Sequence, residues 1–138
     1  MDIANLLSRH AQYQPNKLAL VFEDRRLTYK EYNQNVNRLA NALLDMGIQK
    51  GDKISTLLPN CMEILEVYWA AAKIGAVAVP HSMLLLAEGL RSLLNDSDTI
   101  MVVTNASMVG TLGLIRNDLP AIAEDRFLLI DGGDTPGY

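Results

Sequence analysis

The sequence predicts an α/β protein with a mostly parallel sheet, helices on both faces of that sheet and a small N-terminal β-hairpin. Four short runs are largely apolar rather than alternating, at residues 54–58, 76–80, 100–103 and 127–130. Such runs are typical of strands buried on both faces, as in parallel sheets. Helix-like segments separate the runs, and this alternation indicates right-handed βαβ units.

The N-terminal residues predict a helix followed by the hairpin. Residues 2–13 carry apolar side chains at helical spacing, and Asp2 is a candidate N-cap. Residues 18–22 and 26–28 have strand character and are joined by a short polar turn, which predicts the hairpin.

A capping box marks the start of the next helix. Thr28 and Glu31 have the spacing at which side chain and backbone satisfy each other, and Gly47 can end the helix in the left-handed conformation. The predicted apolar stripe consists of Tyr32, Val36, Leu39, Ala40, Leu43 and Leu44.

Three further helices are predicted between the four strands. The first starts at Asn60 with Glu63 and ends at Gly75, and its expected apolar face is Cys61, Ile64, Leu65, Tyr68, Trp69 and Ala72. The second runs over residues 86–94, and its expected buried residues are Leu86, Leu90, Leu93 and Leu94. The third covers residues 106–118 and is weakened by Gly110 and Gly113.

These elements divide the chain into three stretches. Residues 1–49 hold the first helix, the hairpin and the capping-box helix. Residues 50–131 hold the βαβ units, and residues 132–138 form a loop tail. The sequence shows no internal repeat and no linker.

Composition and charge exclude several classes of protein. Sixteen acidic residues against twelve basic ones give a net charge of −4, without the basic stripe that nucleic-acid binding needs. No apolar run approaches the roughly 20 residues that cross a bilayer. The single cysteine, Cys61, cannot form an internal disulfide, and the first residues lack a signal-peptide pattern. We therefore expect a cytoplasmic protein without a transmembrane segment.

Ligands of open parallel sheets bind at the carboxyl ends of the strands. The sequence places Pro59-Asn60, His81-Ser82, Thr104-Asn105 and Asp131 there. No glycine-rich loop with a lysine joins a strand to a helix, so neither the dinucleotide fingerprint nor the phosphate loop is present. The tail, residues 132–137, is rich in glycine but has no lysine. The sequence therefore predicts no catalytic, cofactor-binding or metal-binding residue.

Each potentially reactive side chain has a structural interpretation that is simpler than a catalytic one. His81 adjoins Ser82, but a catalytic pair needs a third group that orients the base, so a polar loop histidine is favoured. His10 lies near the end of a helix, where a cation favours the helix dipole. Cys61 in a first helical turn could have a lowered pKa, but its place on the apolar stripe favours a core residue.

The aromatic and acidic residues of the third predicted helix have similar interpretations. Tyr68 and Trp69 fit packing better than a ligand cage. Glu63 and Glu66 lie one helical turn apart without a third ligand, which indicates a solvated flank rather than a metal site.

Several segments, in order and spacing, resemble the N-terminal region of the adenylate-forming (AMP-binding) superfamily, and most of all the AMP-forming acyl-CoA synthetases. The similarity extends to about Thr104. The matching segments are residues 17–22, 26–32, 36–43, 47–54, 57–60, 71–80 and 94–97.

This resemblance implies a larger parent enzyme. Such enzymes join a carboxylate to ATP, release pyrophosphate and form an acyl-adenylate, and most then transfer the acyl group to coenzyme A. The family's phosphate loop, its adenine and magnesium residues and its C-terminal domain lie beyond residue 138. The chain is thus expected to be a partial N-terminal subdomain, inactive alone, with the remainder of the enzyme as its partner. ATP, Mg²⁺ and coenzyme A are implied only for the full-length enzyme.

One segment departs from the family pattern. Many relatives have Asn-Pro-Arg after a Val-Pro pair, and in some of them the arginine lies near the nucleotide end of coenzyme A. Here the corresponding residues fall within 81–84 and include no arginine. The resemblance therefore implies no coenzyme A phosphate contact from this segment, and it names no carboxylic acid.

Two alternatives stay open. The chain could be a stand-alone flavodoxin-like binding module, although the missing phosphate loop and the abrupt end of the chain after its loop tail oppose this. It could also belong to another adenylating enzyme, such as a luciferase-like oxygenase or a peptide-synthetase adenylation domain. If it is part of a larger enzyme, exposed apolar surface should make it associate into homo-oligomers.

Overall fold

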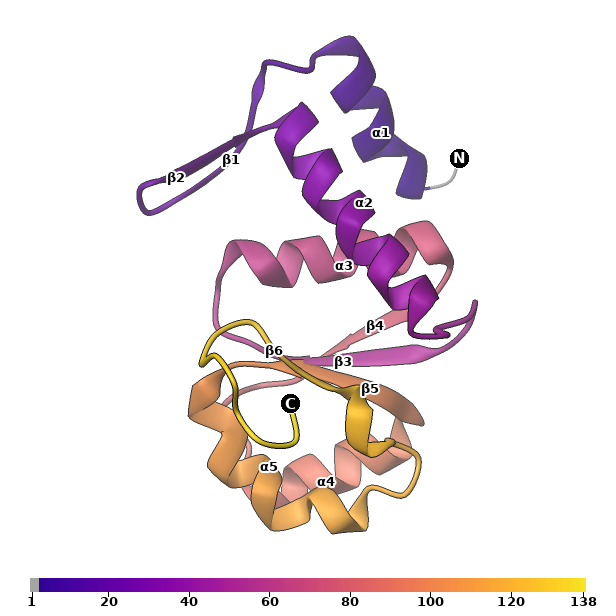
Figure 1. Ribbon diagram of the computed structural model, residues 1–138, viewed down its shortest axis with the longest axis vertical. Coiled ribbons are helices and arrows are strands. Elements are labelled where there is room, and N and C mark those ends of the chain that lie inside the picture. Colours follow the sequence, from indigo (N-terminus) through magenta and orange to yellow (C-terminus); the bar gives the residue numbers. More distant parts are fainter. Residues whose placement is uncertain (1–2) are drawn as a thin grey trace. The chain divides into compact units, whose positions relative to one another are not determined.

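The computed structural model describes residues 3–138, which divide into two compact units (Figure 1). The first unit contains residues 3–51 and 60–76, and the second contains residues 52–59 and 77–138. Each unit has its own secondary structure, and the two are described separately.

The first unit contains three helices and a hairpin. Its elements are α1 (Ala4–Tyr13), β1 (Leu18–Phe22), β2 (Arg25–Thr28), α2 (Tyr29–Asp45) and α3 (Met62–Ile74). The predicted hairpin is confirmed, because β1 and β2 pair antiparallel with Phe22 opposite Arg25. Ile3 is the residue that precedes α1, and Asp2, the predicted cap, lies outside the described residues.

The predicted capping box at the start of α2 is confirmed. The hydroxyl of Thr28 accepts the backbone N–H of Glu31 at 3.3 Å, and the Glu31 carboxylate accepts the backbone N–H of Thr28 at 2.8 Å. Gly47 takes the left-handed conformation just after the helix, with φ 84°. Most of the predicted stripe is buried. Leu44 is half exposed, so its assignment to the stripe is wrong.

Helix α3 begins after Cys61 and ends at Gly75, whose φ of 75° is the predicted left-handed stop. Its predicted apolar face is wrong: Leu65 is exposed, and the buried residues are Met62, Val67, Ala70 and Ala71. Apolar side chains surround most of this helix, so periodicity alone does not select one face. The elements that pack against α3 therefore determine which of its residues are buried.

The second unit is built on a four-stranded, wholly parallel sheet in the order β4-β3-β5-β6. The strands are β3 (Lys53–Leu57), β4 (Val77–Pro80), β5 (Thr99–Thr104) and β6 (Phe127–Leu129). All four predicted strands are therefore confirmed, with small shifts at their ends. The central strands β3 and β5 are almost entirely buried, whereas the edge strand β4 is partly exposed.

Helices α4 (Ala87–Asp96) and α5 (Val109–Ile115) pack side by side against this sheet (Figure 1). The helix predicted over residues 106–118 consists of three pieces, because 3₁₀ turns η1 (Ala106–Met108) and η2 (Arg116–Asp118) flank α5. A further 3₁₀ turn, η3 (Glu124–Arg126), leads into β6.

The second unit has a hydrophobic core between its sheet and these helices. The core residues are Leu57, Leu90, Leu94, Val102, Met108, Leu112, Ile115, Leu119, Ile122 and Phe127. Two of the leucines predicted to be buried in α4 are exposed instead: Leu86 by 82% and Leu93 by 42%. Leu86 precedes the first helical turn in extended conformation, so it does not share the face that Leu90 and Leu94 bury.

No helix within residues 3–138 is long and apolar enough to cross a membrane.

Candidate functional site

The carboxyl edge of the parallel sheet is the place where this fold would hold a ligand. His81 follows β4, Asn105 follows β5 and Asp131 follows β6. The backbone ladder continues into these residues, since His81 N–H donates to the Thr56 carbonyl at 2.9 Å. The predicted edge residues of the second unit are thus brought to one edge, as parallel strands require.

The polar groups at the β5 and β6 ends bind one another. The Asp131 carboxylate accepts the backbone N–H of Ala106 at 2.7 Å, and the Ser107 hydroxyl donates to the side-chain oxygen of Asn105 at 2.7 Å. Asp131 also places a negative charge beside the first turn after β5, where it repels a phosphate group. This edge is therefore occupied by internal hydrogen bonds and is not an anion cradle.

His81 does not pair with Ser82, its neighbour in sequence, but with Ser55 in the middle of β3. The Nε2 atom of His81 lies 2.9 Å from Ser55 Oγ, which lies 2.5 Å from Thr99 Oγ1. Thr99 in turn lies 2.7 Å from Ser97 Oγ, whose hydroxyl donates to the Leu94 carbonyl at 3.2 Å. A chain of hydroxyl groups therefore links His81 through β3 and β5 to the end of α4.

Sequence reasoning missed this network because its members are far apart along the chain. The one available signal was the presence of Ser55 and Thr99 inside otherwise apolar strands. Polar side chains buried in a sheet need hydrogen-bond partners, so each of them indicated a second buried polar group.

The Ser55–His81 contact has the distance of a nucleophile–base pair but not its other properties. Ser55 is fully buried, so no substrate carbonyl can reach its oxygen. Thr99 is a neutral hydroxyl and contacts Ser55 rather than His81, whereas the histidine of a hydrolytic triad is held by a carboxylate. Burial lowers the pKa of His81, because desolvation disfavours the imidazolium form. The arrangement fits a role in holding β3, β4 and β5 together.

Cys61 is neither a core residue nor an activated thiol. It is the residue that precedes α3, and it is partly exposed rather than part of a buried stripe, so the prediction of a core position is wrong. Burial of its sulfur, with a smaller contribution from Glu63, raises the pKa of the thiol. A raised pKa leaves little thiolate at neutral pH and therefore little nucleophilic reactivity.

The two glutamates of α3 bind separate partners. Glu63 forms an ion pair with Arg25 at 2.6 Å, and Glu66 accepts a hydrogen bond from the Asn35 amide at 2.8 Å. Among residues 3–138 no group of three metal-ligating side chains exists. Tyr68 and Trp69 on the same helix are half-buried.

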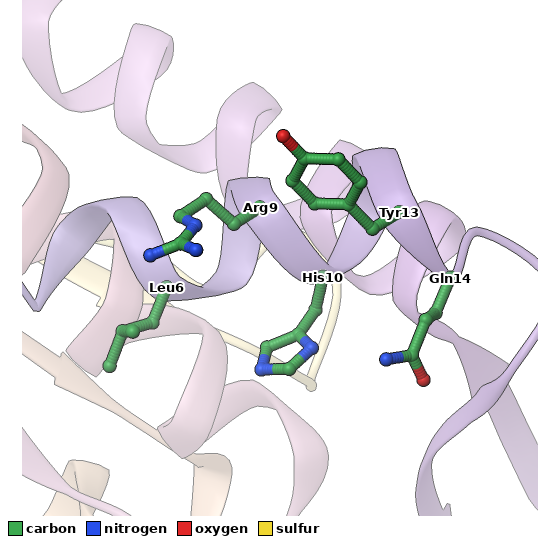
Figure 2. Close-up of a pocket in the computed structure, with 5 residues that line it drawn as sticks. All are labelled: Leu6, Arg9, His10, Tyr13 and Gln14. Atoms are coloured by element: carbon green, nitrogen blue, oxygen red, sulfur yellow. The ribbon is translucent and has the colours of Figure 1, made fainter.

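Helix α1 carries a shallow hollow of about 360 Å³, lined by Leu6, Arg9, His10, Tyr13 and Gln14. Figure 2 shows that these side chains come from α1 and from Gln14, the residue that follows its last turn, with His10 and Gln14 pointing the same way. His10 lies in the last turn of α1, as predicted, and its ring stacks on Tyr29 with the centroids 4.9 Å apart. A single helix face without converging groups from a second element offers a ligand little enclosure.

Comparison with known proteins identifies a family, which the geometry of the site alone does not identify. The family described as "AMP-binding enzyme" matches residues 7–135. A crotonobetaine/carnitine–CoA ligase of Salmonella typhimurium is 36% identical over 108 residues, which are 75% of this chain and 21% of that protein. The long-chain-fatty-acid–CoA ligase FadD13 of Mycobacterium tuberculosis is 36% identical over 117 residues, which are 83% of this chain and 23% of that protein.

Solved structures agree with the sequence comparisons. The anthranilate CoA ligase AuaEII in complex with anthranoyl-AMP matches with a TM-score of 0.93 and 25% identity, over 100% of this chain and 26% of that chain. The N-terminal domain of FACL13 from Mycobacterium tuberculosis matches with a TM-score of 0.88 and 32% identity, over 94% of this chain and 33% of that chain. The chain spans about a fifth to a third of these proteins, and it belongs to the family of AMP-binding enzymes.

Proposed function

We propose that this chain is the N-terminal scaffold of an ATP-dependent, AMP-forming acyl-CoA synthetase. The parent enzyme would activate a carboxylic acid as an acyl-adenylate and transfer the acyl group to coenzyme A. The match to the AMP-binding family over residues 7–135 carries this proposal. The two curated relatives are CoA ligases by name, which supports coenzyme A as the acceptor over the other adenylating chemistries.

The described residues do not fit ATP, Mg²⁺ or coenzyme A. A triphosphate needs cationic side chains or free backbone N–H groups. At the carboxyl edge of the sheet Asp131 contributes a negative charge and already accepts the Ala106 N–H, and His81 is engaged with Ser55. Leu84, in the segment where relatives of this type often have an arginine, is apolar and 91% exposed. We therefore assign these three groups to other parts of the parent enzyme.

The role that remains for this chain is packing, and the chain alone should have no catalytic activity. Leu84 and Leu86 support a partner, since the two lie in one loop and are 91% and 82% exposed. We propose that the remainder of the enzyme covers them. In its absence the chain should self-associate, and light scattering at high protein concentration that shows only monomer would count against this.

A graft tests the scaffold role directly. Residues 7–135 would replace the matching N-terminal segment of the Mycobacterium FadD13 ligase, and ATP–pyrophosphate exchange with fatty acids would be measured. We expect the chimera to keep its exchange rate within about tenfold of the parent ligase, which is close to 1.4 kcal/mol in barrier height. The ungrafted chain should show no exchange. A folded chimera without exchange would contradict the proposal.

Two substitutions within the chimera separate a scaffold from a catalytic contribution. Asp131→Asn keeps the shape of the side chain and His81→Gln keeps its hydrogen-bonding capacity, and each removes the acid–base function. We expect the exchange rate to stay the same for both variants. A loss of about 100-fold or more is what removal of a general acid or base produces, and it would show that this chain takes part in the chemistry.

A further inference from the structure

The hydrogen bonds around His81 form an unbroken chain whose protons can be counted. The chain runs from His81 Nε2 to Ser55 Oγ at 2.9 Å, to Thr99 Oγ1 at 2.5 Å, to Ser97 Oγ at 2.7 Å and to the Leu94 carbonyl at 3.2 Å. Each of these four contacts has the length of a hydrogen bond and needs a proton between its two atoms. All five residues belong to the second unit.

The end of the chain at Leu94 fixes the direction of the bonds. Leu94 is 1% exposed, and a carbonyl oxygen can only accept. The nearest backbone donors serve other carbonyls, because Ser97 N–H donates to Leu93. The next one, Asp98 N–H, donates to Asn95. Among the described residues the Ser97 hydroxyl is therefore the donor that Leu94 receives, and without it a buried carbonyl would be left unpaired at a cost in free energy.

Three hydroxyl groups cannot supply the protons of four contacts. Ser97 donates to Leu94, so the contact between Ser97 and Thr99 takes the proton of Thr99. The contact between Thr99 and Ser55 then takes the proton of Ser55. The remaining contact, between Ser55 and His81, needs a proton on Nε2 of the imidazole. The opposite direction of donation would leave the buried Leu94 carbonyl without a donor.

The other ring nitrogen of His81, Nδ1, is left as an acceptor. A neutral imidazole carries one N–H, so a proton on Nε2 leaves a lone pair on Nδ1. Nδ1 has no hydrogen-bond partner within residues 3–138, and it is not one of the buried unpartnered atoms of that region, so solvent reaches it. Burial is the cause of the lowered pKa of His81, without a contribution from a charged side chain among the described residues. The hydroxyl chain is therefore the feature that selects the tautomer.

We propose that the hydroxyl chain holds His81 as the Nε2–H tautomer and thereby presents Nδ1 at the end of β4 as a hydrogen-bond acceptor. The group that binds there is a donor, such as a hydroxyl, an amine or an amide N–H, whereas the lone pair repels an unprotonated phosphate oxygen. The end of α4 thus determines, through β5 and β3, which nitrogen of His81 carries the proton. This coupling goes beyond the proposed scaffold role and does not depend on it.

Nuclear magnetic resonance of the imidazole nitrogens tests the assignment in the folded protein. The chain has two histidines, so His10 serves as an internal reference. At about pH 8, above the ordinary histidine pKa, long-range proton–nitrogen spectra show which ring nitrogen is protonated. We expect Nε2–H to exceed Nδ1–H in wild-type His81 by about fivefold or more, the ratio that one buried hydrogen bond supports. A predominant Nδ1–H form would overturn the proposal.

Two substitutions that cut the chain give the decisive comparison, because an imidazole in water already has a moderate preference for Nε2–H. Ser97→Ala removes the donor to Leu94, and Thr99→Val removes the acceptor of the Ser55 proton. In each variant the remaining hydroxyl protons all find an acceptor only if Ser55 donates to Nε2. We therefore expect the tautomer ratio of His81 to move toward Nδ1–H by about fivefold or more in both variants.

Ser92→Ala is the matched control, because Ser92 is exposed on α4 and takes part in none of the four contacts. It should leave the His81 spectrum unchanged, and the His10 signals should stay the same in all three variants. An unchanged tautomer ratio in folded Ser97→Ala protein would refute the proposal. Ser97 is only partly buried, so this variant decides the question even if Thr99→Val does not fold.

Discussion

The ammonium group of Lys73 lies 2.6 Å from the side-chain oxygen of Asn33, so a charge on α3 is bound by a neutral amide on α2. The same group donates to Asn37 Oδ1 at 2.7 Å and to Ser8 Oγ at 2.9 Å. One lysine therefore ties together α1, α2 and α3 without a carboxylate in its set of acceptors. Burial lowers the pKa of Lys73, as expected for a cation with neutral partners.

Replacement of Lys73 by methionine should loosen the three-helix unit. Lys73→Met keeps the aliphatic stem but removes three charge-assisted hydrogen bonds, and we expect a loss of roughly 1–2 kcal/mol in the free energy of unfolding. Chemical denaturation measures this loss. Lys30→Met on the exposed side of α2 is the control and should change stability by no more than about 0.5 kcal/mol. A Lys73→Met protein as stable as the wild type would show that the three hydrogen bonds of Lys73 contribute nothing to stability.

The hydroxyl network at His81 should make stability depend on pH. Burial depresses the pKa of His81 below its ordinary 6.5, so the folded state resists protonation that the unfolded chain accepts. The contribution is fully present above pH 6.5 and is lost as the pH falls through the lower, folded value. We expect the Tm of the wild type to fall more steeply than that of His81→Gln between about pH 7 and pH 5. Parallel Tm profiles for the two proteins would refute this assignment.

Helix α4 begins without a capping side chain. Leu86 occupies the N-cap position, is 82% exposed and provides no hydrogen bond to the first-turn amides among the described residues. Leu86→Ser should supply that bond and raise the free energy of unfolding by about 1 kcal/mol. Leu84→Ser makes the same chemical change at a 91% exposed position outside the cap and should have little effect. Equal effects of the two substitutions would exclude capping as the cause.

Two fully buried threonines on neighbouring strands should respond in opposite ways to valine. The Thr56 hydroxyl has no hydrogen-bond partner within residues 3–138, whereas the Thr104 hydroxyl donates to the Leu57 carbonyl at 3.0 Å. Valine has nearly the same shape, so Thr56→Val should be neutral or stabilising by up to about 1 kcal/mol. Thr104→Val should destabilise by about 1 kcal/mol. Thermal unfolding of both variants measures these changes, and a marked loss of stability for Thr56→Val would contradict the prediction.

Local signals explain why much of the fold could be predicted. Thr28 and Glu31 act on adjacent backbone groups, and Gly75 ends α3 through its own left-handed conformation, so neither depends on distant residues. The four strands were predictable because short apolar runs bounded by turn residues are typical of buried strands. The family resemblance was likewise carried by the order and spacing of segments.

Misplaced helix boundaries and contacts between distant segments account for the errors. Leu86 looks like a core leucine by spacing, but the helix starts one residue after it and it faces solvent. Cys61 was predicted to lie on a buried stripe of α3, but the helix begins one residue after it. The partner of His81 could not be predicted, since Ser55 lies 26 residues away and no local rule pairs them.

The amino-acid sequence by itself determined the parallel α/β class, the hairpin, the capped helix α2 and the resemblance to AMP-binding enzymes, since periodicity and turn chemistry act over a few residues. The tertiary structure alone decided which face of α3 is buried, which serine His81 contacts, which three acceptors bind Lys73, and that Arg116 lies over the rings of Phe127 and Tyr138. Those choices depend on side chains that meet only after the chain has folded, and the distances between them along the sequence carry no information about which will meet.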